Sequence, residues 1–138
     1  MLPIGMEYGF VNRVNVVKTN PTDWEESKFD ISGFIAEANK LKSYKIFSED
    51  NEIVPIETVK KRVFCFLKTS KDKEEKALII INNDRYYHQH IHMDLAQVMG
   101  SSLSQIKDIS VEYAMSELPV VLDYGLRPAQ VMIFYLKA

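Results

Sequence analysis

Two short apolar runs, at residues 62–67 and 77–81, constrain the fold of this chain more than any other feature. They read RVFCFL and ALIII, and the charged stretch at 71–76 separates them. Runs of this length, rich in β-branched and aromatic residues and joined by a polar loop, predict a β-hairpin. Both runs are apolar at odd and at even positions, whereas a strand with one solvated face alternates apolar and polar residues. We therefore expect the outer face of at least one sheet to be covered. A helix at residues 31–42, a second domain or another chain could cover it.

Further short strands are expected after this hairpin. Alternating or apolar patterns place them at residues 88–93, 109–113, 120–122 and 131–136. A turn is expected at 82–85, and one helical turn over 95–99 should end at Gly100. Several short strands with turn signals between them are typical of a sandwich or barrel. We predict a mainly β fold, an antiparallel β-sandwich of Greek-key-like type with an N-terminal loop and helix extension.

The N-terminal extension contains one amphipathic helix, which we expect over residues 31–42. Its apolar stripe consists of Ile31, Phe34, Ile35, Ala38 and Leu41. Asp30 stands at the N-cap position, and Lys40 lies near the C-terminal end, where positive charge is favoured. Upstream, residues 20–26 predict a turn with a short helical turn near Trp24.

Composition narrows the class of protein. The chain has 138 residues, of which 46% are hydrophobic and 26% charged, as in ordinary globular domains. A net charge of -2 gives no basic excess for nucleic acid, and the basic cluster at 60–62 is too small to indicate it. No apolar run approaches the roughly 18 residues of a membrane span, and no signal-peptide pattern begins the chain. We expect a soluble, cytoplasmic protein with no nucleic-acid or membrane partner.

Three N-terminal segments resemble the end of the catalytic barrel in α-amylase-type enzymes. Residues 3–10 and 16–25, PIGMEYGF and VVKTNPTDWE, resemble the region of the last barrel strand, and DISGFIAEANKL at 30–41 resembles the last barrel helix. These enzymes belong to glycoside hydrolase family thirteen, and the segments resemble a branch near the bacterial maltosyltransferases. The character of the chain changes near residue 50, so residues 1–50 are expected to be the remnant of a β/α barrel.

Two β-type segments carry the resemblance into the second half. The runs ALIIINN at 77–83 and LRPAQVMIFYL at 126–136 resemble strands of the C-terminal β-sandwich of the same family. The resemblance therefore implies that residues 51–138 are a C-terminal β-sandwich domain. A β/α barrel needs about 250 residues, so the rest of it would belong to a longer parent chain.

The resemblance also implies what the chain lacks. Retaining enzymes of this family use two carboxylic acids held roughly 5 Å apart, one as nucleophile and one as acid and base. The family carries them on barrel strands before the eighth, and this chain would begin at about the eighth. We expect no catalytic residue and no cofactor here. The parent is expected to be a retaining glycosidase or transglycosylase acting on α-1,4-glucans, and the fragment alone to be inactive.

Three residues of the N-terminal segments are candidates for substrate binding in the full-length parent. Residues beyond the end of a barrel strand line the active-site mouth, so Glu7 could hydrogen-bond a sugar hydroxyl and Tyr8 could stack on a pyranose ring. Trp24 is the only tryptophan, and its ring could also stack on a sugar. The alternative for the fragment is structural: Tyr8 and Trp24 bury area in a core, and Glu7 is solvated.

A row of histidines is the sharpest local pattern of the second half. His88, His90 and His92 would share one face of a strand, and such a spacing can begin a zinc or copper site. Further ligands would have to come from elsewhere, and no second cluster is visible. We expect a polar strand face and no metal, with these histidines as weak metal candidates. Cys65, the single cysteine, lies between two phenylalanines and is expected to be an inert core thiol without a disulfide.

Two functions from different classes remain open. In the first, the chain is an accessory domain that packs on the catalytic barrel of the same parent and stabilises it. In the second, it is a stand-alone β-sandwich module for binding or oligomerisation, whose doubly apolar strands mark an interface. Possible partners are therefore the parent barrel, an α-glucan and a second copy of the chain.

Overall fold

The computed structural model of the chain describes residues 6–12, 17, 18, 20–27 and 29–137. The chain divides into two compact units, with the boundary between Lys42 and Ser43. Each unit is described by itself. No helix within the described ranges is long and apolar enough to cross a membrane.

The first unit contains α1, Ser32–Lys40, which confirms the helix expected over residues 31–42. Single 3-10 helical turns occur at Met6–Tyr8 and Pro21–Asp23. The Asp30 carboxylate accepts a hydrogen bond from the Ser32 amide at 2.8 Å and so satisfies a free donor at the start of α1. No residue of α1 is fully buried: Phe34 is exposed, and Ile35 and Ala38 are half-buried.

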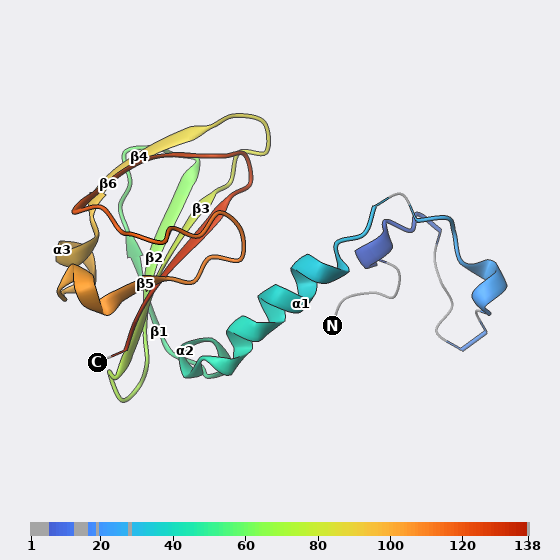
Figure 1. Cartoon of the computed structure of the whole chain (residues 1–138), viewed down its shortest axis with the longest axis horizontal. Helices are drawn as coiled ribbons and strands as arrows, with labels where there is room; N and C mark the ends of the chain where they lie inside the picture. Colours follow the sequence, from blue (N-terminus) through green and yellow to red (C-terminus); the bar gives the residue numbers. More distant parts are fainter. Residues whose placement is uncertain (1–5, 13–16, 19, 28, 138) are drawn as a thin grey trace. The chain divides into compact units, whose positions relative to one another are not determined.

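The second unit is built from two antiparallel sheets, as the sequence predicts (Figure 1). The five-stranded sheet has the order β1-β2-β3-β7-β5, and the two-stranded sheet pairs β4 with β6. The strands are β1 Glu52–Ile56, β2 Val63–Thr69, β3 Glu75–Asn82, β4 Gln89–Asp94, β5 Ile106–Asp108, β6 Val121–Leu126 and β7 Val131–Lys137. Two short helices, α2 Lys45–Ser48 and α3 Leu95–Met99, complete the unit. β2 and β3 form the expected hairpin, and α3 ends at Gly100, whose φ is 64°.

The prediction of a strand at residues 109–113 is wrong. β5 ends at Asp108, whose carboxylate accepts hydrogen bonds from the backbone amides of Ser110 and Met115, each at 2.9 Å. Tyr113 adopts a left-handed φ of 57°, which a strand does not contain. The apolar alternation is genuine, but the aspartate engages amides that a strand ladder would need.

β1 is a strand that its own sequence does not predict. Pro55 lies in its middle and cannot donate a ladder hydrogen bond. β1 pairs only with β2 and forms the edge of the sheet, where a missing donor is tolerated.

The hydrophobic core lies between the inner face of the five-stranded sheet and a second layer formed by β4, β6 and α3 (Figure 1). Its buried members are Val63, Cys65, Leu78, Ile80, Ile91, Leu95, Met99, Ile106, Leu122, Leu126, Met132, Phe134 and Leu136. Burial of a large apolar side chain contributes about 1.5–3 kcal/mol, so this cluster holds the two layers together.

The outer face of the five-stranded sheet is apolar as well. Phe66 lies opposite Ile79, and Phe64 lies opposite Ile81, so these four side chains share a face. The row continues into β7, because Ile79 is paired with Ile133. The prediction that these strands are apolar on both faces is therefore confirmed for β2, β3 and β7.

α2 covers one end of this outer face. Ile46 is fully buried, and its backbone amide donates to the Glu75 carboxylate at 2.9 Å. The rings of Tyr44 and Tyr135 meet edge to face at 4.7 Å. Burial and the neighbouring Glu75 carboxylate raise the pKa of Tyr135 to about 12.

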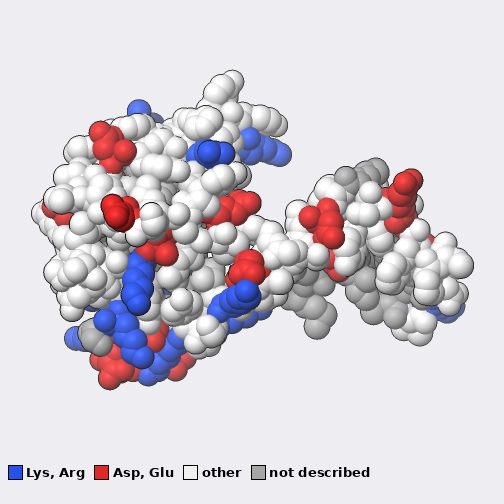
Figure 2. Space-filling view, in the orientation of Figure 1, with Lys and Arg blue, Asp and Glu red and all other residues white. Residues whose placement is uncertain are grey.

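A salt bridge holds the start of α2 to the hairpin loop. Lys45 pairs with Asp72, and the ammonium lowers the pKa of that carboxyl below its usual range. Figure 2 shows Lys and Arg interspersed with Asp and Glu on the visible face of the second unit. That face therefore carries charges of both signs.

Asn82 fixes the end of β3. Its side-chain nitrogen donates toward the carbonyl oxygens of Tyr87, Leu126 and Arg127 at 3.0, 3.3 and 2.8 Å. Its side-chain oxygen accepts from the Asp84 amide at 2.9 Å. The amide is buried, so one side chain joins the turn after β3 to the end of β6.

Asn82→Ala is expected to lower the free energy of unfolding by about 3 kcal/mol, because it leaves buried carbonyl groups without a donor. Urea denaturation followed by circular dichroism would measure the loss. Asn83→Ala is the matched control: Asn83 is the exposed neighbour, and its truncation is expected to change the same quantity by about 0.5 kcal/mol or less. Equal effects of the two changes would contradict the role of Asn82.

Candidate functional site

An apolar groove occupies the end of the outer sheet face that α2 does not cover. Its floor is formed by Ile53 and Pro55 of β1, Phe64 and Phe66 of β2, and Ile81 of β3, and its volume is about 590 Å³. Pro55 lies opposite Phe66, so the floor runs continuously from the edge strand into the sheet. Phe64 is 51% exposed and Ile53 56% exposed, which is unusual for side chains of this size.

The groove has a cationic rim. Lys60 and Lys61 line it from the connection between β1 and β2, together with Thr58. Apolar groups with few polar partners cannot orient a small polar substrate, whereas they gain free energy when another apolar surface removes them from water. The groove is therefore a candidate docking surface for protein.

The outer face is thus covered only in part by the second unit itself. α2 buries the end near Tyr135, whereas Phe64 and Val131 at the other end of the face stay exposed. Ile53, on the edge strand, is exposed as well. What covers the exposed end, whether the helix α1, another domain or another chain, stays a prediction.

The three sequence candidates for substrate binding lie in the first unit. Glu7 and Tyr8 belong to the turn Met6–Tyr8, and Trp24 follows the turn Pro21–Asp23. The ring of Phe10 lies between the other two rings, 6.0 Å from Tyr8 and 6.4 Å from Trp24. The structure therefore brings Tyr8 and Trp24 into one aromatic cluster, in which Trp24 is 55% exposed. A role in sugar binding stays a prediction for all three residues.

Backbone hydrogen bonds order the segments that carry this cluster. The Glu25 carboxylate accepts from the amides of Val11 and Asn12 at 3.0 and 2.5 Å. The carbonyl oxygen of Glu7 accepts from the Ile31 amide at 2.9 Å. Parts of the resembling segments, namely residues 3–5, 16 and 19, lie outside the described residues.

Gly9 has a clear reason to be glycine. Its φ is 71°, and a Cβ at this position would come within 2.5 Å of the Phe29 ring. Any other residue would therefore be strained and would also displace that ring.

The histidine row faces an aspartate that sequence reasoning did not identify. His90 and His92 lie on β4, and Asp123 lies directly opposite His92 on β6. The Asp123 carboxylate is 2.8 Å from Nε2 of His90 and 3.9 Å from Nδ1 of His92. His88 precedes the strand. Ile91, which lies between His90 and His92 on the strand, is buried in the core, whereas both histidines are exposed. The strand therefore has the polar face that the sequence predicts.

The part of the chain that the structure describes contains no group of three or more His, Cys, Asp or Glu residues that could hold a metal ion. Asp123 lies near the histidines only because of the register between β4 and β6. No local sequence pattern predicts that pairing.

Cys65 is a core thiol, as expected. It lies in the buried cluster beneath the two-stranded sheet, and burial raises its pKa to about 11. A thiol in this state is a poor nucleophile, because the thiolate is the reactive form.

Comparison with known proteins gives likenesses of structure only. No family model matches the chain, and no curated protein matches its sequence. Trehalose-6-phosphate hydrolase from Bacillus licheniformis is similar with a TM-score of 0.48 and 17% identity, over 74% of this chain. An alpha-galactosidase/melibiase candidate from Bacteroides fragilis is similar with a TM-score of 0.44 and 20% identity, over 58% of this chain.

Glycoside hydrolases are therefore among the solved structures that the chain resembles at low identity. The chain spans 17% of the length of each. Placement near the maltosyltransferase branch stays a prediction.

Native Cys65 is expected to react with Ellman's reagent at pH 8 at least about 100-fold more slowly than the same thiol in the unfolded chain, because it is both buried and protonated. Absorbance during labelling with and without 6 M guanidinium measures the two rates, and the denatured sample is the control for reagent and concentration. Complete labelling of the native protein within the mixing time would contradict the buried position.

Proposed function

We propose that this chain is the C-terminal accessory domain of an α-amylase-family carbohydrate-active enzyme that acts on α-1,4-glucans. In this role the β-sandwich unit packs on the catalytic barrel of the same parent chain and stabilises it. The apolar groove of the five-stranded sheet carries the proposal. The resemblance of residues 3–41 to the end of a family thirteen barrel supports it.

The groove fits a permanent domain interface. Its floor is apolar and continuous across β1, β2 and β3, and its exposed aromatic ring, Phe64, resembles the central anchor of a packed interface. Removing apolar surface from water contributes roughly 25 cal/mol per Å², so a neighbouring domain seated there would stabilise both partners. The lysines at the rim suit acidic side chains on the opposing surface.

The helix α1 adds an independent argument. Within α1, Phe34 of the apolar stripe is exposed and Ile35 is only half-buried. A helix of a β/α barrel buries such a stripe against the barrel strands. A stripe that is buried only in part is therefore expected where most of the barrel belongs to the parent.

The division of labour in the parent follows from the resemblance. The two carboxylic acids that cleave or transfer glucosyl units lie on earlier barrel strands. Glu7, Tyr8 and Trp24 would contribute to the rim of that active site as sugar-binding residues. The β-sandwich would contribute no group to the reaction, and the fragment alone would have no activity.

A stand-alone module for binding or oligomerisation is the second candidate. The same groove favours it, because two copies of the chain could bury their exposed phenylalanines against each other. The two candidates differ in the size of the native protein.

An immunoblot of the source cells with an antibody to this chain is expected to show a band several times larger than the 138-residue chain itself. The barrel and its loops account for the difference, since a barrel alone needs about 250 residues. Purified chain mixed into the lysate marks the position of the chain alone and controls for proteolysis. A native band only at the position of the purified chain would reject the accessory-domain proposal in favour of the stand-alone module.

The purified chain is expected to self-associate through the groove in the absence of the barrel. Phe64→Ser should raise the dissociation constant of the dimer at least about tenfold, because it removes the largest exposed apolar group of the floor. Sedimentation velocity over a range of concentrations measures this. Val120→Ser is the matched control, since Val120 is exposed but lies outside the groove. A chain that stays monomeric at every concentration would contradict the groove as an interface.

A further inference from the structure

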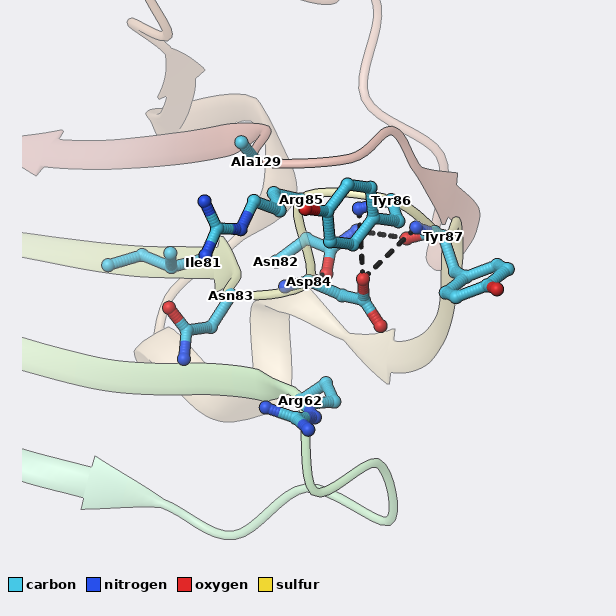
Figure 3. Close-up of a pocket in the computed structure, with 9 residues that line it drawn as sticks. All are labelled: Arg62, Ile81, Asn82, Asn83, Asp84, Arg85, Tyr86, Tyr87 and Ala129. Carbon is cyan, nitrogen blue, oxygen red and sulfur yellow. Dashed lines mark hydrogen bonds between the residues drawn. The ribbon is translucent and has the colours of Figure 1, made fainter.

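A second pocket lies at the turn between β3 and β4, and its chemistry differs from that of the groove. It has a volume of about 720 Å³ and is lined chiefly by polar and aromatic side chains (Figure 3). The side chains that matter are Arg62, Asn83, Asp84, Arg85, Tyr86 and Tyr87. Pockets of this size accommodate small ligands in many proteins.

The backbone of this turn is held in one conformation. The Asp84 carboxylate accepts hydrogen bonds from the amides of Tyr86 and Tyr87 at 3.0 and 3.1 Å. The buried Asn82 side chain binds the amide of Asp84 and the carbonyl oxygen of Tyr87. From the other side, the Ala129 amide donates to the Asp84 carbonyl oxygen at 3.0 Å. A ligand at this turn would therefore not have to order the backbone, which favours binding.

Two tyrosine rings project from this ordered turn. Tyr86 is 73% exposed and Tyr87 is 70% exposed. Figure 3 shows the Tyr87 ring directed away from the strands, while the Arg85 guanidinium lies 5.5 Å from the Tyr86 ring. Tyrosine offers a large contact area at a low cost in conformational entropy, and its ring face is negative. The C–H groups of a pyranose ring, which carry partial positive charge, suit that face.

Hydrogen-bond donors and acceptors are mixed around the rings. Arg85 and Arg62 lie on either side of Asn83 and Asp84 in Figure 3 and supply donors only. The exposed amide of Asn83 supplies both kinds of group. The Oδ2 atom of Asp84 makes a long contact of 3.4 Å to the Gln89 side chain, and a carboxylate oxygen can accept a further hydrogen bond.

The mixture of groups discriminates between ligand classes. An anion would be attracted by the two arginines but would meet the Asp84 carboxylate between them. The amide hydrogen bond from Tyr86 lowers the pKa of that carboxyl, which keeps it ionised at neutral pH. A neutral polyhydroxylated ligand can accept from the arginines and donate to the aspartate at the same time.

We infer that this pocket is a binding site for a neutral saccharide, with one sugar ring on Tyr86 or Tyr87 and its hydroxyl groups on Arg62, Asn83 and Asp84. The site binds and does not cleave. The inference rests on the proposed function only in the choice of an α-1,4-glucan as the first probe.

Titration of the full chain with maltoheptaose and with cellohexaose, followed by nuclear magnetic resonance of the backbone amides, tests the inference. Binding of either saccharide should shift the amides of residues 83–87. In Tyr86→Ala combined with Tyr87→Ala the dissociation constant should rise at least tenfold. The corresponding change to phenylalanine at both positions should keep it within about threefold, because the ring faces remain. Tyr113→Ala, a change at an exposed tyrosine outside the pocket, should leave binding unchanged.

Several outcomes would overturn the saccharide site. These are no shift with either sugar, shifts confined to other residues, or equal binding by the double alanine variant. Inorganic phosphate that shifts residues 83–87 when neither sugar does would also reject the inference, since it would make the pocket an anion site. A thermal melt checks that each variant is folded, which is expected because both tyrosines are exposed.

Failure here is separable from failure of the proposed function. A native immunoblot band at the position of the purified chain would reject the accessory-domain role and leave saccharide binding untouched. Phe64→Ser is expected to weaken self-association, whereas the tyrosine variants are expected to leave it unchanged, because none of the tyrosines lines the groove.

Discussion

The pairing of β2, β3 and β7 into a sheet that is apolar on both faces is the constraint on which the second unit depends. The inner face is satisfied within the unit, because β4, β6 and α3 close over Leu78, Ile80 and Phe134. The outer face is satisfied only at one end, where α2 inserts Ile46. Most of the remaining exposed apolar surface of the sheet lies in the groove. The proposed docking of a barrel there would remove that surface from water.

The two candidate surfaces of the second unit, the groove and the pocket at Asp84, suit different kinds of partner. The groove offers apolar area with a basic rim and suits a large partner that excludes water. The pocket at Asp84 offers mixed donors and acceptors beside exposed rings and suits a small polyhydroxylated ligand. Asn82 serves both the fold and the pocket, because the same amide that links β3 to the end of β6 also holds the turn that displays the tyrosines. A parent enzyme with this domain would gain stability from one surface and contact with sugar from the other.

Local patterns predicted those parts of the site that depend on near neighbours in sequence. The spacing of His90 and His92 placed both on one strand face, and the flanking phenylalanines placed Cys65 in the core. Asp123 could not be predicted, since it reaches the histidines only through the register of β4 with β6. The pocket tyrosines gave no signal either, because only the folded chain shows that the Asn82 side chain and the Ala129 amide hold the turn that carries them.

The sequence by itself determined the hairpin of β2 and β3, the helix α1, the turn of α3 that ends at Gly100 and the mainly β class, because each depends on periodicity and capping within a few residues. The tertiary structure alone decided that β1 joins the edge despite Pro55, and that the chain leaves β5 at Asp108 rather than extending to Tyr113. It also decided which half of the outer face is covered. These outcomes depend on contacts between residues far apart in the chain, such as the Ile46 amide with Glu75, and no local pattern encodes them.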